Sequence, residues 1–133
     1  MTSKAVIYSS LTGKTRKTGQ YLAEKLGADS FDLKKQTLID MSEYSHIIFG
    51  TGMHFGKPYK ALLEFAEANR PALAKKRVSL FACCKIGDKK GADQCKAAAD
   101  AVGAAEWAFF CGKGDKNPDG FEVALDDFVG RMR

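Results

Sequence analysis

Long hydrophobic runs are missing from this sequence of 133 residues. The apolar run nearest the N-terminus, Ala5–Tyr8, is far shorter than the roughly 7–15 residues of a signal-peptide core or the about 20 of a membrane-spanning helix. Hydrophobic residues make up 45% and charged residues 28%, a balance typical of globular proteins in water. We therefore expect a cytoplasmic protein without stable membrane association.

Cysteine spacings that are typical of metal sites are missing as well. The candidate ligands are four cysteines and two histidines, namely Cys83, Cys84, Cys95, Cys111, His46 and His54. No two cysteines form Cys-x-x-Cys, and neither histidine lies at a ligand spacing from another candidate. The adjacent cysteines would form only a strained disulfide. The sequence thus predicts no metal site, and free thiols that are buried or half-buried.

The sequence lacks required residues of several motifs that bind nucleotides or phosphate. Gly13-Lys14-Thr15 matches the end of a Walker A loop, but that motif needs a glycine where this chain has Tyr8. No Gly-x-Gly-x-x-Gly fingerprint lies there, and no cysteine begins the Cys-x5-Arg motif of tyrosine phosphatases. A phosphoacceptor receiver domain needs an acidic pair where this chain has Ser9-Ser10. These patterns disfavour the corresponding enzymes and signalling domains.

Positive charge exceeds negative charge, but it is not gathered into one stretch of the sequence. The chain has 21 Lys and Arg against 16 Asp and Glu, a net charge of +5. The basic residues form short runs at Lys34-Lys35, Lys75–Arg77 and Lys89-Lys90. An Arg-rich stripe with interleaved aromatics, typical of nucleic-acid binding, does not occur. We therefore expect no nucleic-acid partner.

Short apolar runs alternate with helical patterns from one end of the chain to the other. The expected strands are Lys4–Tyr8, Ala28–Leu33, His46–Gly50, Val78–Ala82 and Trp107–Cys111. The expected helices are Thr15–Gly27, a helix that Pro58 opens, Gly91–Gly103 and Phe121–Met132, with one short helical stretch around Leu38–Tyr44. This alternation predicts an α/β fold, with a parallel sheet and helices on both of its faces.

No repeat, linker or low-complexity tract divides the sequence, so we expect one domain over residues 1–133. In open α/β sheets, ligands bind beyond the carboxyl ends of the strands. The loops to inspect are therefore Ser9–Thr15, Thr51–Lys57, Cys83–Lys90 and Gly112–Asp119.

The first of these loops has the composition of an anion site. Its hydroxyls on Ser10, Thr12 and Thr15 can donate to phosphate oxygens, and the following helix N-terminus adds backbone N–H groups and a favourable dipole. Gly13 lets the backbone turn in close to the anion. The alternative is a polar turn that only caps the helix. Three hydroxyls around one glycine exceed what a cap requires, which favours phosphate binding.

The segment Tyr8–Thr15 resembles the loop of flavodoxins that binds the FMN phosphate, usually written S/T-x-T-G-x-T. Ser10, Thr12, Gly13 and Thr15 match that motif. The second loop, Phe49–Pro58, is similar to that of the flavodoxin-like menaquinone-dependent protoporphyrinogen oxidases. The order of elements matches over nearly the whole chain. The resemblance implies a flavodoxin-like three-layer sandwich whose five-stranded parallel sheet has the order 2-1-3-4-5, with FMN as cofactor.

The resemblance also implies which residues bind the cofactor. They are Ser9, Ser10, Leu11, Thr12, Gly13, Lys14 and Thr15 in the first loop, Thr51, Gly52, Met53, His54, Phe55 and Gly56 in the second, and Cys83, Cys84, Lys85 and Gly87 in the third. His54 or Phe55 is the expected ring contact, and Cys83 and Cys84 bring backbone N–H groups to the pyrimidine edge. Phe55 has a second interpretation as a hydrophobic plug, and His54 as a solvated loop residue.

We expect an FMN-binding redox protein that passes electrons to or from a partner protein or a small donor or acceptor. No catalytic residue is assigned. Two alternatives stay open: a flavin-dependent oxidase or quinone reductase of the protoporphyrinogen-oxidase type, and a non-redox module that keeps the fold and its anion site. The chain is basic where typical flavodoxins are acidic, and its third loop, Cys83–Asp88, has no aromatic residue.

Overall fold

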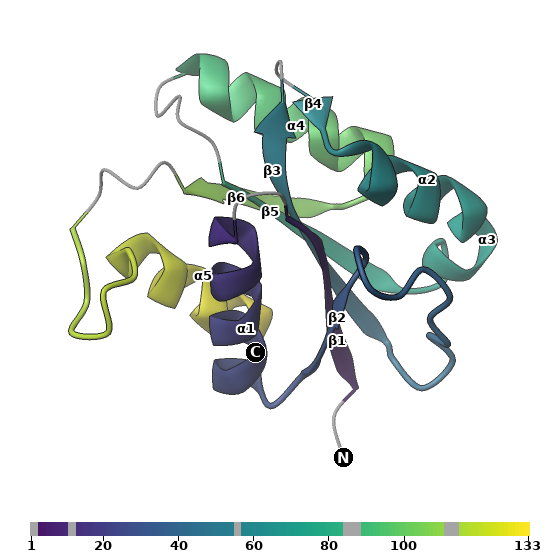
Figure 1. Ribbon diagram of the computed structural model, residues 1–133, viewed down its shortest axis with the longest axis horizontal. Coiled ribbons are helices and arrows are strands. Elements are labelled where there is room, and N and C mark those ends of the chain that lie inside the picture. Colours follow the sequence, from purple (N-terminus) through teal and green to yellow (C-terminus); the bar gives the residue numbers. More distant parts are fainter. Residues whose placement is uncertain (1–2, 11–12, 55–56, 84–88, 111–114) are drawn as a thin grey trace.

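Five parallel strands form the central sheet in the part of the chain that the computed structural model describes, residues 3–10, 13–54, 57–83, 89–110 and 115–133 (Figure 1). They are β1 (Lys4–Ser9), β2 (Asp29–Asp32), β3 (His46–His54), β5 (Arg77–Cys83) and β6 (Glu106–Phe110). Their spatial order is β2-β1-β3-β5-β6, and the short β4 (Lys57–Pro58) pairs antiparallel with the end of β3. The parallel strands thus confirm the predicted order, and β4 is an addition to it.

Helices cover both faces of the sheet, which makes the three layers that were predicted. The helices are α1 (Lys14–Leu26), α2 (Lys60–Ala68), α3 (Arg70–Leu73), α4 (Lys89–Val102) and α5 (Val123–Met132). Figure 1 shows α1 and α5 together on one side of the sheet, and α2, α3 and α4 on the other. None of the described helices is long and apolar enough to cross a membrane. The expectation of one domain over residues 1–133 stays a prediction.

The alternation of side chains along β1 and β3 builds two separate cores. Val6 and Ile48 point to the side of α1 and α5, whereas Ile7 and Phe49 point to the side of α2 and α4, and all four are fully buried. Residues of parallel strands that are covered on both faces read as continuous apolar runs, which is why the sequence located these strands well.

The approach of β3 to β5 requires a residue without a side chain at one position. A Cβ atom on Gly50 would lie 2.1 Å from the ring of Phe81, which is fully buried in the core beneath α1 and α5. Gly50 therefore fixes how closely the Phe81 ring packs against β3, just before the strand reaches the carboxyl edge of the sheet.

A buried histidine lies at the opposite, amino-terminal edge of the sheet. His46 Nε2 is 2.9 Å from Ser79 Oγ, and Ser79 Oγ donates in turn to Glu106 Oε1 at 3.3 Å. Arg77 pairs with Glu106 and also donates to the carbonyl oxygen of Arg131 in α5. This network ties three strands and one helix together far from the loops that were predicted to bind a cofactor.

The helical stretch predicted around Leu38–Tyr44 is wrong. Turns and irregular backbone connect β2 to β3. Asp40 Oδ1 accepts a hydrogen bond from the backbone N–H of Ser42 at 2.9 Å, a local bond that competes with helical hydrogen bonding. Ile39, Met41 and Tyr44 are buried against the core, so tertiary packing fixes this segment.

The second loop and the helix that follows it both begin later in the chain than the sequence predicted. β3 continues through Thr51–His54, which were expected in a loop, and Pro58 belongs to β4 instead of opening a helix. The backbone N–H of Tyr59 donates to Thr51 Oγ1 at 3.1 Å, and α2 begins at Lys60. Other boundaries differ from the predicted ones by one or two residues.

Candidate functional site

Strand register brings the predicted cofactor loops together at the carboxyl edge of the sheet. Ser9, at the end of β1, lies opposite Thr51 of β3, and Gly52 of β3 lies opposite Cys83 at the end of β5. The first, second and third loops therefore leave the sheet side by side. Of the predicted residues, Leu11, Thr12, Phe55, Gly56, Cys84, Lys85 and Gly87 lie outside the described part of the chain, as does the side chain of His54.

The first loop presents the uncapped N-terminus of α1. Gly13 precedes the helix with φ of 89°, a left-handed conformation that a side chain would strain, and none of the side chains that the structure describes caps the helix. Ser10 Oγ instead accepts a hydrogen bond from the Gly13 N–H at 3.0 Å, which fixes the turn. The first-turn N–H groups of a helix have no partner within the helix, so α1 directs N–H donors and its positive dipole end at this edge.

Two hydroxyls in the same place have no hydrogen-bond partner among the described residues. Ser9 is 7% and Thr15 is 3% exposed, and neither side chain makes a hydrogen bond within the part of the chain that the structure describes. The residues are buried as a whole, but their hydroxyl oxygens are not among the fully buried atoms that lack a partner, so these oxygens reach the surface and are open to a bound ligand. Unpaired hydroxyls beside the amino end of a helix are suited to donate to an anion, as the sequence predicted for Thr15.

The second loop contributes backbone more than side chains. Thr51 is fully buried, and its hydroxyl donates to the Gly52 carbonyl at 2.7 Å while accepting from the Tyr59 N–H. Met53 is half-buried and packs against the core beneath α2 and α4. The side chains of Thr51 and Met53 thus hold the end of β3 in place, and a direct contact with a cofactor stays a prediction for both.

Sequence reasoning missed Tyr59, which lies at the centre of this edge. A Cβ atom on Gly52 would lie 2.3 Å from the Tyr59 hydroxyl oxygen, so the ring occupies the space that the glycine leaves. Since Gly52 lies opposite Cys83, the phenol is close to the end of β5. Burial, followed by Cys83, raises the pKa of Tyr59. The sequence feature that could have indicated Tyr59 is its position: it is an aromatic residue directly after Pro58, at the start of the helix.

Cys83, the last residue of β5, packs against α1. It is 8% exposed, and its Sγ lies 3.9 Å from Thr18 Oγ1, which itself donates to the carbonyl oxygen of Lys14. Cys83 and Cys95 are both buried, and neither forms a disulfide within the described residues; Cys84 and Cys111 lie outside that part of the chain. The Cys83 side chain therefore faces the protein interior, and its backbone is the part that reaches the edge.

The charge around this edge is positive. Lys14, Arg16 and Lys17 are exposed in the first turn of α1, which has no acidic residue, and Lys57 is exposed in β4. Among the residues that the structure describes, no group of His, Cys, Asp and Glu is placed to hold a metal ion. The edge thus combines N–H donors, hydroxyls and lysines, which is the chemistry of an anion site.

Two hollows border this region without lying at the expected ring position. One of about 180 Å³ lies between the first turns of α1 and the segment before α5, where Lys14, Lys17, Phe110 and Phe121 line it. The other, of about 710 Å³, lies between α2 and the irregular segment after β2, where Leu38 and Phe65 line it.

Comparison with known proteins agrees with this geometry. The sequence matches the flavodoxin domain family over residues 5–124. The chain belongs to this flavodoxin family. A curated relative, an uncharacterized protein (MJ0298) of Methanocaldococcus jannaschii, is 32% identical over 63 residues, which are 47% of this chain and 42% of the relative. The matched region therefore spans less than half the length of that protein.

Solved flavodoxin-like structures have the same fold. The two-electron reduced flavodoxin of Megasphaera elsdenii superimposes with a TM-score of 0.70 at 19% identity, over 96% of this chain and 98% of that one. A flavoprotein of Lactobacillus acidophilus in complex with FMN superimposes with a TM-score of 0.64 at 14% identity, over 80% and 92%. At these identities, the comparison establishes the flavodoxin-like fold of the chain.

Proposed function

We propose that this flavodoxin-family protein binds FMN non-covalently at the carboxyl edge of β1, β3 and β5, and passes electrons to or from a partner protein or a small donor or acceptor. The observation that carries the proposal is the Thr15 hydroxyl, which has no partner among the described residues and lies beside an N-terminus of α1 that none of the described side chains caps. The family membership and the FMN complex of a structural neighbour support the same cofactor. The cytoplasmic location and the absence of nucleic-acid and membrane partners stay predictions from the sequence.

The phosphate would be held by the first loop. The hydroxyls of Ser9 and Thr15 donate to its oxygens together with the first-turn N–H groups of α1. Ser10 keeps the turn in shape by accepting the Gly13 N–H, and its own hydroxyl hydrogen is left to donate outward. Hydrogen bonds to a charged group contribute about 1.5–3 kcal/mol each. A riboflavin without phosphate would lose these contacts.

The ring would lie over the ends of β3 and β5. Gly52 exposes its backbone there, Tyr59 supplies an aromatic side chain, and the Cys83 backbone borders the same space. FMN supplies the redox chemistry itself, so the residues around it need only bind, orient and shield it. The predicted ring contacts His54 and Phe55 lie next to these residues in the chain and stay predictions.

Reductive titration tests the proposed function. The purified protein is loaded with FMN, reduced anaerobically with dithionite, and followed by its absorption while an acceptor is added. We expect reversible bleaching of a yellow protein, and reoxidation by several unrelated acceptors, including a redox protein. An electron carrier shows this lack of preference because it stores electrons without a specific substrate.

Two results would point to the other functions. Reoxidation by menadione alone, with saturation kinetics, would make the protein a quinone reductase or oxidase instead of a carrier. A colourless protein that ignores added FMN would be a module that keeps the fold without its cofactor, and it would overturn the proposal.

A further inference from the structure

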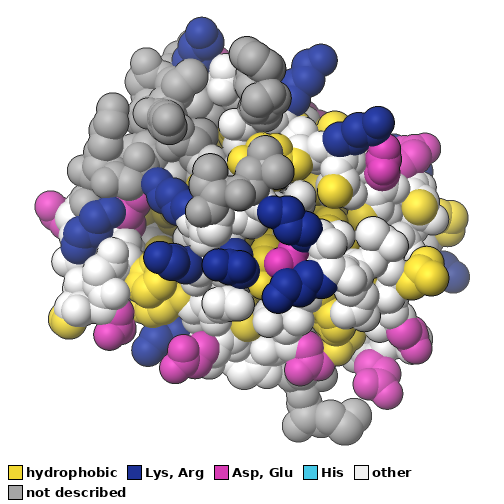
Figure 2. All heavy atoms as spheres, viewed as in Figure 1, with side chains coloured by type: hydrophobic (Ala, Val, Ile, Leu, Met, Phe, Trp, Pro, Cys, Tyr) yellow, Lys and Arg dark blue, Asp and Glu magenta, His cyan; other side chains and the backbone are white. Residues whose placement is uncertain are grey.

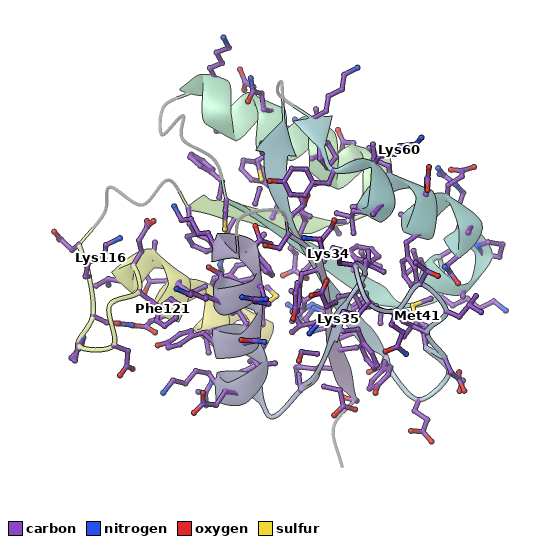
Figure 3. The ribbon with its side chains drawn as sticks, in the orientation of Figure 1. Lys34, Lys35, Met41, Lys60, Lys116 and Phe121 are labelled. Atoms are coloured by element: carbon purple, nitrogen blue, oxygen red, sulfur yellow. The ribbon has the colours of Figure 1, made fainter. Side chains whose placement is uncertain are left out.

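Five exposed basic side chains come together on one face of the molecule. Lys14, Arg16 and Lys17 belong to the first turns of α1, and Lys34 and Lys35 lie in the turn after β2. We name these five residues the α1–β2 basic surface. Figure 2 shows a gathering of Lys and Arg side chains across the middle of this face, and Figure 3 shows Lys34 and Lys35 beside α1.

Tyr8 shows that the two halves of this surface meet. The pKa of Tyr8 is raised by burial and by Asp32, and Arg16 acts on it in the opposite direction. Tyr8 of β1 lies opposite Asp32 of β2, and its ring packs against Gly19 of α1, where a Cβ atom would lie 2.9 Å from the ring. Asp32 Oδ1 accepts a hydrogen bond from the Lys34 N–H at 2.9 Å, which holds the turn that carries the two lysines.

The charge of this surface is not compensated inside the protein. Within the part of the chain that the structure describes, none of the five side chains makes an ion pair. Two carboxylates lie nearby: Asp32 is close to Tyr8, and Glu122 lines the hollow with Lys14 and Lys17. Some basic side chains elsewhere do have acidic partners, as in the pairs Lys60–Glu64, Arg70–Glu67 and Arg77–Glu106. A surface with unpaired charge of one sign attracts ligands of the opposite sign over several ångströms.

The basic surface borders both the proposed cofactor site and a hollow. Lys14 directly follows Gly13 of the first loop. Lys14 and Lys17 also line the hollow of about 180 Å³, whose floor includes Phe110, Phe121 and Leu125. Charged surfaces mainly accelerate and orient association, whereas buried apolar anchors hold a complex together. This face offers both charged side chains and an apolar hollow, and both lie beside the first loop.

We propose that the α1–β2 basic surface is the docking site of an acidic redox protein, which presents carboxylates to the lysines and an apolar anchor to the hollow. The inference rests on the proposed electron-transfer function. A protein fits better than a nucleic acid, because the aromatic rings beside these lysines are already packed within the protein: Phe110 is buried, and the Phe121 ring lies against Tyr21 with 4.2 Å between the ring centroids. The sign of the surface is also opposite to that of typical acidic flavodoxins, so it selects a different class of partner.

Electron transfer to two haem proteins of opposite charge tests the proposal. The reduced, FMN-loaded protein is mixed in a stopped-flow instrument with acidic cytochrome b5 or with basic cytochrome c. For the unmodified protein, we expect the rate constant with cytochrome b5 to fall as salt rises, and that with cytochrome c to rise. For the double variant Lys34→Glu/Lys35→Glu, we expect the rate with cytochrome b5 to fall by about tenfold or more at low salt.

A matched variant separates the surface from the total charge. Lys75→Glu/Lys96→Glu makes the same change in net charge at two exposed lysines away from the surface, one in the turn before β5 and one on α4. It should change the cytochrome b5 rate by less than about threefold. Equal effects of the two double variants, or a rate with cytochrome b5 that salt does not change, would overturn the docking site.

FMN binding and the docking of the partner protein are measured independently. FMN affinity, from fluorescence quenching, should be the same for both double variants and the unmodified protein. If no FMN binds, the proposed function fails, and the surface is tested by calorimetric binding of cytochrome b5, which Lys34→Glu/Lys35→Glu should abolish. Absence of that binding in the unmodified protein overturns the docking site. Tight binding of single-stranded RNA that the same variant abolishes would overturn it too, by making the surface a nucleic-acid site.

Discussion

Thr15→Val should weaken FMN binding by about 10- to 100-fold and change riboflavin binding by less than about twofold. The substitution removes one hydroxyl and keeps the branched shape of the side chain. Thr15 is 3% exposed and has no hydrogen-bond partner among the described residues, so its loss costs the protein little stability. A hydrogen bond to a charged phosphate contributes about 1.5–3 kcal/mol, which corresponds to this range of affinity.

Quenching of flavin fluorescence gives both dissociation constants for the Thr15 variant. Thr18→Val is the matched control, because Thr18 lies one turn further along α1 and its hydroxyl donates to the Lys14 carbonyl. It should leave the ratio of the two affinities unchanged. If Thr15→Val weakens FMN and riboflavin equally, the first loop does not hold the phosphate.

His46 should make the protein lose stability as the pH falls from about 6.5 towards 4. Burial, followed by the nearby positive charge of Arg77, lowers the pKa of His46 to about 4. Its Nδ1 is buried without a hydrogen-bond partner among the described residues, so a proton there would go unpaired. The unfolded chain takes up this proton near pH 6.5 and the folded protein does not, so acid favours unfolding.

The expected loss from His46 is about 2 kcal/mol in the free energy of unfolding between about pH 7 and about pH 5. Urea denaturation at the two pH values measures it. His46→Gln removes the titration and keeps an amide that can reach Ser79, and every other titratable side chain is the same in both proteins. We expect the variant to lose about 2 kcal/mol less than the unmodified protein over this range. Equal losses would show that His46 is protonated in the folded state.

The fold was predictable because its strands are buried on both faces. Runs such as Ala5–Tyr8 and Ile47–Phe49 are continuous and apolar, and each helix between them carries one apolar face. The segment after β2 was not predictable in the same way. Ile39, Met41 and Tyr44 are spaced irregularly, and an Asp40–Ser42 turn together with tertiary packing decides their conformation.

The first loop of the candidate site was predictable from composition, whereas the second was not. The spacing of Ser10, Gly13 and Thr15 directly describes a turn into a helix N-terminus. In the second loop, a hydrogen bond between Thr51 and the Tyr59 backbone and the contact of Gly52 with the Tyr59 ring set the geometry. These contacts link residues seven or eight positions apart across a β-hairpin, and no local pattern in the sequence predicts them.

The most direct test of the account is to map flavin binding on the backbone amides by nuclear magnetic resonance. FMN should shift the amides of Gly13, Lys14 and Thr15 together with those of Gly52 and Cys83. Riboflavin should shift the last two and leave the first three nearly unchanged, since it has no phosphate. Shifts that gather instead around Leu38 and Phe65, in the hollow beside α2, or identical patterns with the two flavins, would contradict a phosphate held at the N-terminus of α1.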